Sequence, residues 1–199
     1  MAEGQKMPSA ADASIGSSAV PHAATILLGR SDDLTPAAYE AVIWGGARVV
    51  LDPDALARVE RHRQLFLRHL ESGVICYGVN TGLGALAKQD LSDADRARLP
   101  RQILLGRAGA IGTPFKREIT RGALLIKLAQ FLDGSCAVTP DLCRFLAARL
   151  NDDFAPAVPS EGLGMAGEII PLCHLAQALI GEGFVLDADQ RPLSAADWF

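Results

Sequence analysis

The chain has 199 residues, 49% of them hydrophobic, which is enough to bury the core of one domain or of part of a larger one. Its formal net charge of −4 and its scattered Lys and Arg argue against nucleic-acid binding. The longest apolar stretches, such as Leu172–Ile180, reach about half of the roughly 20 residues of a membrane span, so we expect a soluble protein that does not contact a membrane. The first residues lack the pattern of a secretion signal, and we expect a cytoplasmic location.

Cysteine and histidine spacing gives no indication of a metal site. The cysteines occur singly in apolar surroundings, where a reduced thiol packs as a small hydrophobic group. No histidine has the i, i+4 partner that a helical zinc site uses. The residues concerned are Cys76, Cys136, Cys143 and Cys173, and His22, His62, His69 and His174.

The N-terminal part of the chain predicts a leader followed by helical structure. Residues 1–22 are rich in Ala, Ser, Gly and Pro without apolar periodicity, and we expect a disordered leader followed by one domain over residues 23–199. Thr35-Pro36 is typical of a helix N-terminus, and that helix should end at Gly45-Gly46.

A short β-branched segment, Val49–Leu51, comes next. Apolar residues at helical spacing from Asp52-Pro53 to Gly73 then predict a helix with one buried face.

Three further helices make the predicted fold class mainly α. They are expected over residues 116–132, from Thr139-Pro140 to Leu150, and over residues 168–180. The chain ends in Trp198-Phe199, an apolar pair that a partner surface could cover.

A glycine-rich segment, Tyr77-Gly78-Val79-Asn80-Thr81-Gly82-Leu83-Gly84, marks a tightly turned loop. It lacks the Lys followed by Ser or Thr of a phosphate-binding loop, so it is weak as a nucleotide motif. The loop does offer a tyrosine that glycine turns can fix in space, and a phenol can act as a general base when it is deprotonated. The alternative is a tyrosine that simply packs in a turn.

This loop resembles that of the histidine and phenylalanine ammonia-lyases, in which the tyrosine is the catalytic base. Residues 104–112, Leu-Leu-Gly-Arg-Ala-Gly-Ala-Ile-Gly, resemble the family segment that lines the substrate ring, and residues 159–183 resemble the cofactor-bearing turn and its following helix. The resemblance extends from about Leu34 to Phe184. It implies the N-terminal part of a helical fold that completes a long-helix bundle in an oligomer, with Tyr77 as base and substrate contacts from Asn80, Gly84, Gly106 and Arg107.

The family makes its electrophile, methylidene-imidazolone (MIO), from an Ala-Ser-Gly triad, and this chain has Met165-Ala166-Gly167 instead. Gly167 retains the nucleophilic nitrogen, but Ala166 has no hydroxyl to leave, so the exocyclic methylene cannot form. The aspartate that follows the triad in the family is Glu168 here, and the turn is one residue shorter upstream. We therefore expect no cofactor.

The family's proteins are considerably longer, and their remaining catalytic groups have no counterpart in this chain. We expect a second polypeptide to supply the C-terminal half of the fold in trans, giving a hetero-oligomer. Exposed bundle helices would otherwise be disfavoured by about 25 cal/mol per Å² of apolar surface.

Arg107 stands where the family selects the substrate ring with His or Leu-type residues. A guanidinium favours a carboxylate, a phosphate or another anionic group. The alternative is a salt bridge to an acidic residue on a neighbouring helix. Gly106 beside it would enlarge the pocket.

Three functions are compatible with these features. The first is an enzyme subunit that uses Tyr77 to deprotonate an activated small-molecule substrate, leading to elimination, isomerisation or cyclisation in specialised metabolism. The second is a non-catalytic scaffold or regulatory subunit of a heteromeric ammonia-lyase. The third is a truncated pseudoenzyme that only binds a ligand. The intact tyrosine loop favours the enzyme.

Overall fold

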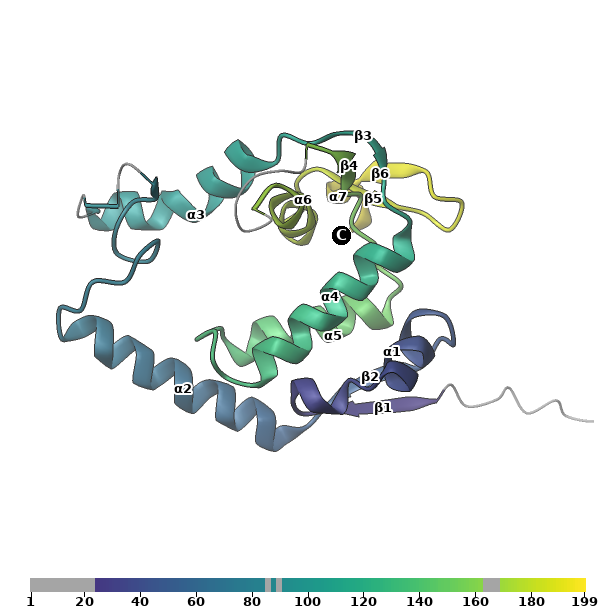
Figure 1. Cartoon of the computed structure of the whole chain (residues 1–199), viewed down its shortest axis with the longest axis horizontal. Helices are drawn as coiled ribbons and strands as arrows, with labels where there is room; N and C mark the ends of the chain where they lie inside the picture. Colours follow the sequence, from purple (N-terminus) through teal and green to yellow (C-terminus); the bar gives the residue numbers. More distant parts are fainter. Residues whose placement is uncertain (1–23, 85–86, 89–90, 163–168) are drawn as a thin grey trace, which may run out of the picture.

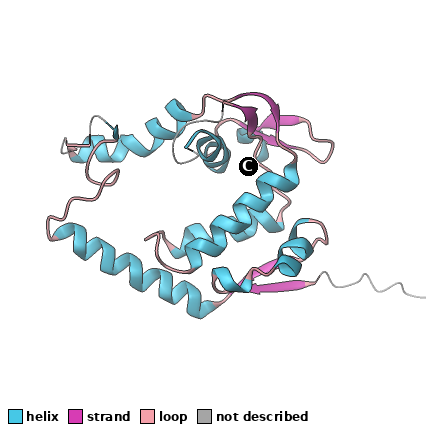
Figure 2. Cartoon of the chain, in the orientation of Figure 1, coloured by secondary structure: helices cyan, strands magenta, loops and turns pink. Residues whose placement is uncertain are grey.

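The computed structural model describes residues 24–84, 87–88, 91–162 and 169–199. Within these residues helices predominate, and the strands form three separate two-stranded sheets (Figure 2). The predicted leader at residues 1–22 and the triad Met165-Ala166-Gly167 lie outside the described residues. No helix in the described part is long and apolar enough to cross a membrane.

The first half of the described chain contains a small parallel sheet and three helices. Its elements are β1 (Thr25–Leu28), the 3-10 helix η1 (Ser31–Asp33), α1 (Pro36–Ile43), β2 (Arg48–Leu51), α2 (Pro53–Glu71) and α3 (Asp93–Arg107). β1 and β2 pair in parallel, with Thr25 opposite Arg48, and α1 forms the crossover between them. The predicted helices and the β2 segment are confirmed. β1 and α3 were not predicted.

The second half alternates helices with short antiparallel strand pairs. Its elements are β3 (Ile111–Pro114), α4 (Arg117–Leu132), α5 (Pro140–Asn151), β4 (Pro159–Glu161), α6 (Ile169–Leu179), β5 (Phe184–Leu186), β6 (Pro192–Ser194) and α7 (Ala195–Trp198). β3 pairs with β4 and β5 pairs with β6. In Figure 1, α2, α4 and α5 form one group, while α3, α6 and the strand pairs β3–β4 and β5–β6 form another.

Three helices begin as their sequences predict, with a capping side chain followed by proline. Thr35 Oγ1 accepts a hydrogen bond from Ala38 N, and Thr139 Oγ1 accepts one from Leu142 N. Asp52 Oδ1 performs the same role at the start of α2. A side-chain oxygen at this position satisfies a backbone N–H that has no partner within the helix, and proline is tolerated in the first turn because that N–H is not needed.

The main core lies where α4 packs against α5, α2 and α1, and where α5 packs against β2 of the parallel sheet. The apolar face of α4 is fully buried at Leu125, Leu128 and Leu132. Removing such side chains from water contributes about 1.5–3 kcal/mol each.

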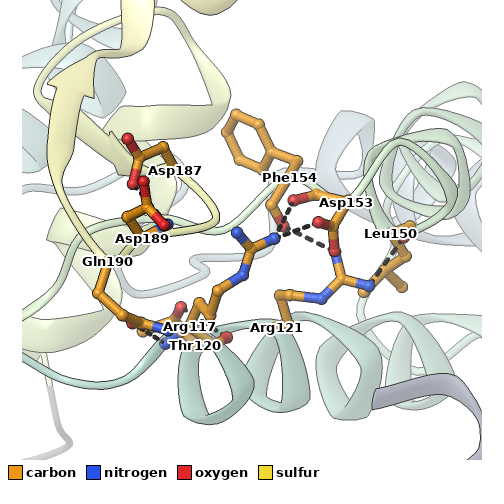
Figure 3. Close-up of polar contacts among 9 residues, drawn as sticks. All are labelled: Arg117, Thr120, Arg121, Leu150, Asp153, Phe154, Asp187, Asp189 and Gln190. Atoms are coloured by element: carbon orange, nitrogen blue, oxygen red, sulfur yellow. Dashed lines mark hydrogen bonds and ion pairs between the residues drawn. The ribbon is translucent and has the colours of Figure 1, made fainter. Parts of the chain in front are cut away.

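Two arginines on α4 form hydrogen bonds with residues at and just after the end of α5, as Figure 3 shows. Arg121 donates hydrogen bonds to the carbonyls of Leu150 (3.0 Å) and Phe154 (3.2 Å), and Arg117 donates to the carbonyl of Asp153 (2.9 Å). Both guanidinium groups also pair with the Asp153 carboxylate. The Leu150 carbonyl also accepts from Asp153 N at 3.4 Å, whereas Arg121 is the donor that the described residues offer to the buried Phe154 carbonyl, so Arg121 satisfies a group that the core would otherwise bury unpaired.

The C-terminal aromatic pair contacts aromatic rings of the chain itself, but Phe199 stays 57% exposed, so the prediction that a partner surface could cover the pair stays a prediction. The ring of Trp198 meets Phe154 edge-on at 5.7 Å, and Phe199 stacks on Phe145 at 6.2 Å. The guanidinium of Arg149 lies 5.4 Å from the centre of the Phe199 ring. Neighbouring aromatic rings and a cation therefore hold this pair in place.

Candidate functional site

The Tyr77 loop connects α2 to α3, and the side chain of Asn80 holds it together. Asn80 Oδ1 accepts a hydrogen bond from Cys76 N, and its Nδ2 donates to Val74 O, both at 2.8 Å. These two bonds tie the start of the loop to its turn. Asn80, predicted as a substrate contact, therefore shapes the loop that presents Tyr77.

Tyr77 is fixed through its hydroxyl while its ring stays accessible. Gly84 N donates a 3.0 Å hydrogen bond to the phenolic oxygen, and 64% of the side chain is exposed. Gly84 has φ +58°, a left-handed conformation that glycine adopts without steric cost. The backbone N–H of Gly84 therefore fixes the position of the phenolic oxygen.

Gly106 and Arg107 are the last two residues of α3. A side chain at Gly106 would meet nothing within 4 Å, so this position leaves open space. Arg107 is exposed and forms no ion pair with any residue that the structure describes. Burial raises the pKa of the neighbouring Cys173 thiol, and the positive charge of Arg107 partly opposes that shift.

Two polar residues of α6, His174 and Gln177, contact the chain on both sides of Arg107, and neither was predicted. His174 Nε2 accepts a hydrogen bond from Ala110 N, and Gln177 Nε2 donates one to Leu104 O, both at 3.0 Å. Burial lowers the pKa of His174. Their i, i+3 spacing on an otherwise apolar helix was the only signal in the sequence.

A cavity of about 470 Å³ lies beside these two residues. Its walls are mostly small and apolar, with His174 and Gln177 as polar groups. The lining includes Ala108, Ala110, Gly112, Pro159 and Phe184. Its size and apolar lining are typical of a small-molecule site.

The predicted site residues form two groups rather than one. The Tyr77 loop lies beside the N-terminal half of α3, where Val79, Asn80 and Arg96 line one hollow. Arg107 is eleven residues further along the same helix, a rise of about 16 Å. Figure 1 shows the loop and α6 near opposite ends of α3. Because α3 was not predicted, this separation could not be foreseen from the sequence.

No group of His, Cys, Asp and Glu within the described ranges could hold a metal ion.

Comparison with known proteins identifies the lineage. The family model for aromatic amino acid lyases matches residues 34–199. The chain belongs to this family. Histidine ammonia-lyase of Geobacillus thermodenitrificans is 36% identical over 167 residues, covering 83% of this chain and 33% of that protein. The enzyme of Anaeromyxobacter dehalogenans is 37% identical over 160 residues, covering 80% and 31%.

Solved structures of lyase-family proteins share the fold. Tyrosine aminomutase from Streptomyces globisporus superposes with a TM-score of 0.74 at 29% identity, covering 88% of this chain and 32% of that one. Ergothionase from Treponema denticola superposes with a TM-score of 0.79 at 23% identity, covering 87% and 34%, which supports the fold alone. The chain thus spans about a third of the length of the lyase-family proteins it matches.

Proposed function

We propose that this lyase-family chain supplies a tyrosine base to an active site that works without MIO. The observation that carries the proposal is the accessible Tyr77 side chain, whose hydroxyl is held by Gly84 N at 3.0 Å. A fixed, exposed phenol becomes a base once it is deprotonated, and its phenolate can then take a proton from a bound substrate.

The residues at the triad do not fit the MIO group. Ring closure followed by loss of water needs a leaving group on the central side chain, and Ala166 has only a methyl. Met165 adds bulk where the family has alanine. We therefore propose that the chain carries no MIO and derive no step through it.

The absence of this electrophile restricts the substrate. The β-proton of an unactivated amino acid is too weak an acid for a phenolate alone, so the substrate needs a C–H already acidified by a carbonyl or thioester. The proton passes from that carbon to the Tyr77 oxygen, and the carbanion then eliminates a group, is reprotonated elsewhere or cyclises. Arg107, exposed and without an ion pair among the described residues, would bind an anionic group of a substrate extended enough to span the roughly 16 Å of α3 that separate it from the Tyr77 loop.

We also propose that a second polypeptide covers this chain in a hetero-oligomer and contributes the rest of the lyase fold. Support comes from large apolar side chains that remain in solvent on helices. Ile119 and Ile126 are 53% and 44% exposed and lie seven residues apart on α4, the spacing of one helix face. A partner helix on this face would remove their apolar surface from water.

The test compares the two tyrosines of the chain in the complex purified with its native partner. Deuterium incorporation from solvent would be measured on a panel of anionic carbonyl compounds and thioesters. Tyr77→Phe should reduce exchange at least a hundredfold, because general-base catalysis contributes about 10²–10⁴. Tyr39→Phe removes a phenol that packs against α4 and should leave exchange unchanged. Equal exchange by wild type and Tyr77→Phe removes Tyr77 from the mechanism.

The exposed face of α4 also favours a second candidate, a scaffold or regulatory subunit that holds a catalytic paralogue. The scaffold hypothesis predicts a full-length partner that has its own Ala-Ser-Gly triad. The activity of that partner should be the same with the wild-type chain and with Tyr77→Phe. Mass spectrometry of the co-purified partner distinguishes the two.

A further inference from the structure

Helix α6 contacts α3 and the segment that follows it on both sides of Arg107. Gln177 bonds Leu104, three residues before Arg107, and His174 bonds Ala110, three residues after it. His174 and Gln177 are themselves three residues apart, so they project from the same face of α6. Two hydrogen bonds from α6 therefore hold the backbone on both sides of Arg107.

Both bonds occur where α3 ends and the backbone lacks helical partners. The carbonyl of Leu104 is one of the last four in α3, none of which has a donor within the helix. Ala108 leaves the helical conformation with ψ 67°, and Gly109 N donates to Arg107 O at 2.9 Å in a tight turn. The course of the chain around Arg107 thus depends on the side chains of α6.

The two bonds differ in their response to pH. His174 Nε2 can accept from Ala110 N only when the imidazole is neutral, with its proton on Nδ1. The Gln177 amide does not titrate. Protonation of His174 would place two N–H groups face to face and break the bond to Ala110, whereas the bond to Leu104 would remain.

The charged groups on the elements packed around His174 are few. The C-terminal half of α3, which contacts α6, carries Arg101 and Arg107; Glu161 lies on β4 and Glu182 follows α6, while the other charged residues of α3 lie in its N-terminal half. Arg101 pairs with Glu182, and the Glu161 side chain lies against the backbone of β3. Burial, rather than any of these charges, is the cause that lowers the pKa of His174. The imidazole is therefore neutral at neutral pH and becomes protonated only below its ordinary pKa of 6.5.

We infer that His174 and Gln177 are positioning residues that set the place of Arg107 through their hydrogen bonds to Ala110 and Leu104. We call these two bonds the clamp. In acid, protonated His174 releases the bond to Ala110. The inference deepens, and rests on, the anion-binding role proposed above for Arg107. The clamp joins side chains of α6 to backbone groups around Arg107, so it can be measured without a substrate.

Hydrogen exchange of the Ala110 amide, followed by NMR on the full chain, tests the clamp. In the wild type, the Ala110 protection factor should fall about five- to tenfold between about pH 7 and pH 5, as one hydrogen bond is lost. In His174→Gln the amide oxygen reaches the place of Nε2 and cannot be protonated, so protection should persist across this range. In His174→Leu protection should be low throughout.

Protection that does not change with pH in the wild type overturns the clamp. This measurement needs no substitution, so it stands even if His174→Leu fails to fold. The Ala110 amide could show the expected protection while the Arg107 Nε–H resonance is the same in wild type and His174→Leu. That result would overturn the link between the clamp and Arg107.

Benzoate, an aromatic carboxylate, separates this inference from the proposed function. It should shift the Arg107 Nε–H resonance in the wild type and His174→Gln, with at least fivefold weaker affinity in His174→Leu. If benzoate does not shift the Arg107 Nε–H resonance while protection of the Ala110 amide follows the expected pattern, the anion-binding role is refuted and the clamp is supported.

Discussion

Replacing Arg121 by methionine should destabilise the chain through the end of α5. Arg121 is 6% exposed and donates to the carbonyls of Leu150 and Phe154. Its pKa is lowered chiefly by burial, an effect that the negative charge of Asp153 opposes. The Asp153 side chain is 68% exposed, so the ion pair itself contributes little. The carbonyl bonds therefore dominate the stabilising effect of Arg121.

Methionine would fill much of the space of Arg121 but leave the buried Phe154 carbonyl without a donor among the described residues, while the Leu150 carbonyl would keep only the 3.4 Å bond from Asp153 N. One buried carbonyl without a donor costs about 1–3 kcal/mol, so the free energy of unfolding should fall by about that amount. Urea denaturation followed by circular dichroism measures this change. Arg121→Lys should lose most of the same free energy, because an ammonium cannot reproduce the planar fork that reaches both carbonyls.

Arg144→Met is the matched control. Arg144 pairs with Asp141 on the surface of α5, with the two side chains 57% and 90% exposed. Such pairs contribute about 0–1 kcal/mol, so stability should barely change. A loss in Arg121→Met no larger than in Arg144→Met would refute the claim that the carbonyl bonds stabilise this end of α5.

Two further predictions concern packing and thiol chemistry. Gly122→Ala should lower the free energy of unfolding by about 1–3 kcal/mol in urea denaturation, because its new Cβ would overlap the hydroxyl of Tyr39. Gly106→Ala, where the new Cβ meets open space, should be neutral or slightly stabilising. Burial raises the pKa of Cys143 to about 11, so iodoacetamide near pH 8 should alkylate exposed Cys136 and leave Cys143 unmodified by peptide mass spectrometry. Equal losses in the two glycine variants, or equal alkylation of the two thiols, would contradict the packing described here.

Helices that begin with a cap and a proline were predictable because their signals are local. A capping residue followed directly by proline predicts the start of each of these helices, at Thr35, Asp52 and Thr139. Helix α3 was not predictable in the same way. Its apolar residues do not gather on one face, and Pro100 stands in its interior, so both periodicity and propensity argue against a helix.

The turned conformation of the tyrosine loop was predictable from the sequence, but the arrangement of the candidate site residues was not. The tyrosine loop was identified from its glycines, and Gly84 does adopt the left-handed backbone that such a loop requires. The separation of Tyr77 from Arg107 follows from α3, and the contacts of His174 and Gln177 follow from the packing of α6 against α3. Contacts between residues that are more than sixty positions apart leave no local pattern in the sequence.

The central claim is that this lyase-family chain keeps the tyrosine base without the family's electrophile. The most direct test is the mass of the proteolytic peptide that contains Met165-Ala166-Gly167, from protein purified with its native partner. The expected mass is that of the unmodified sequence. A peptide lighter by one water and two further hydrogens, which is the mass of a closed ring that carries an exocyclic methylene, would contradict the claim.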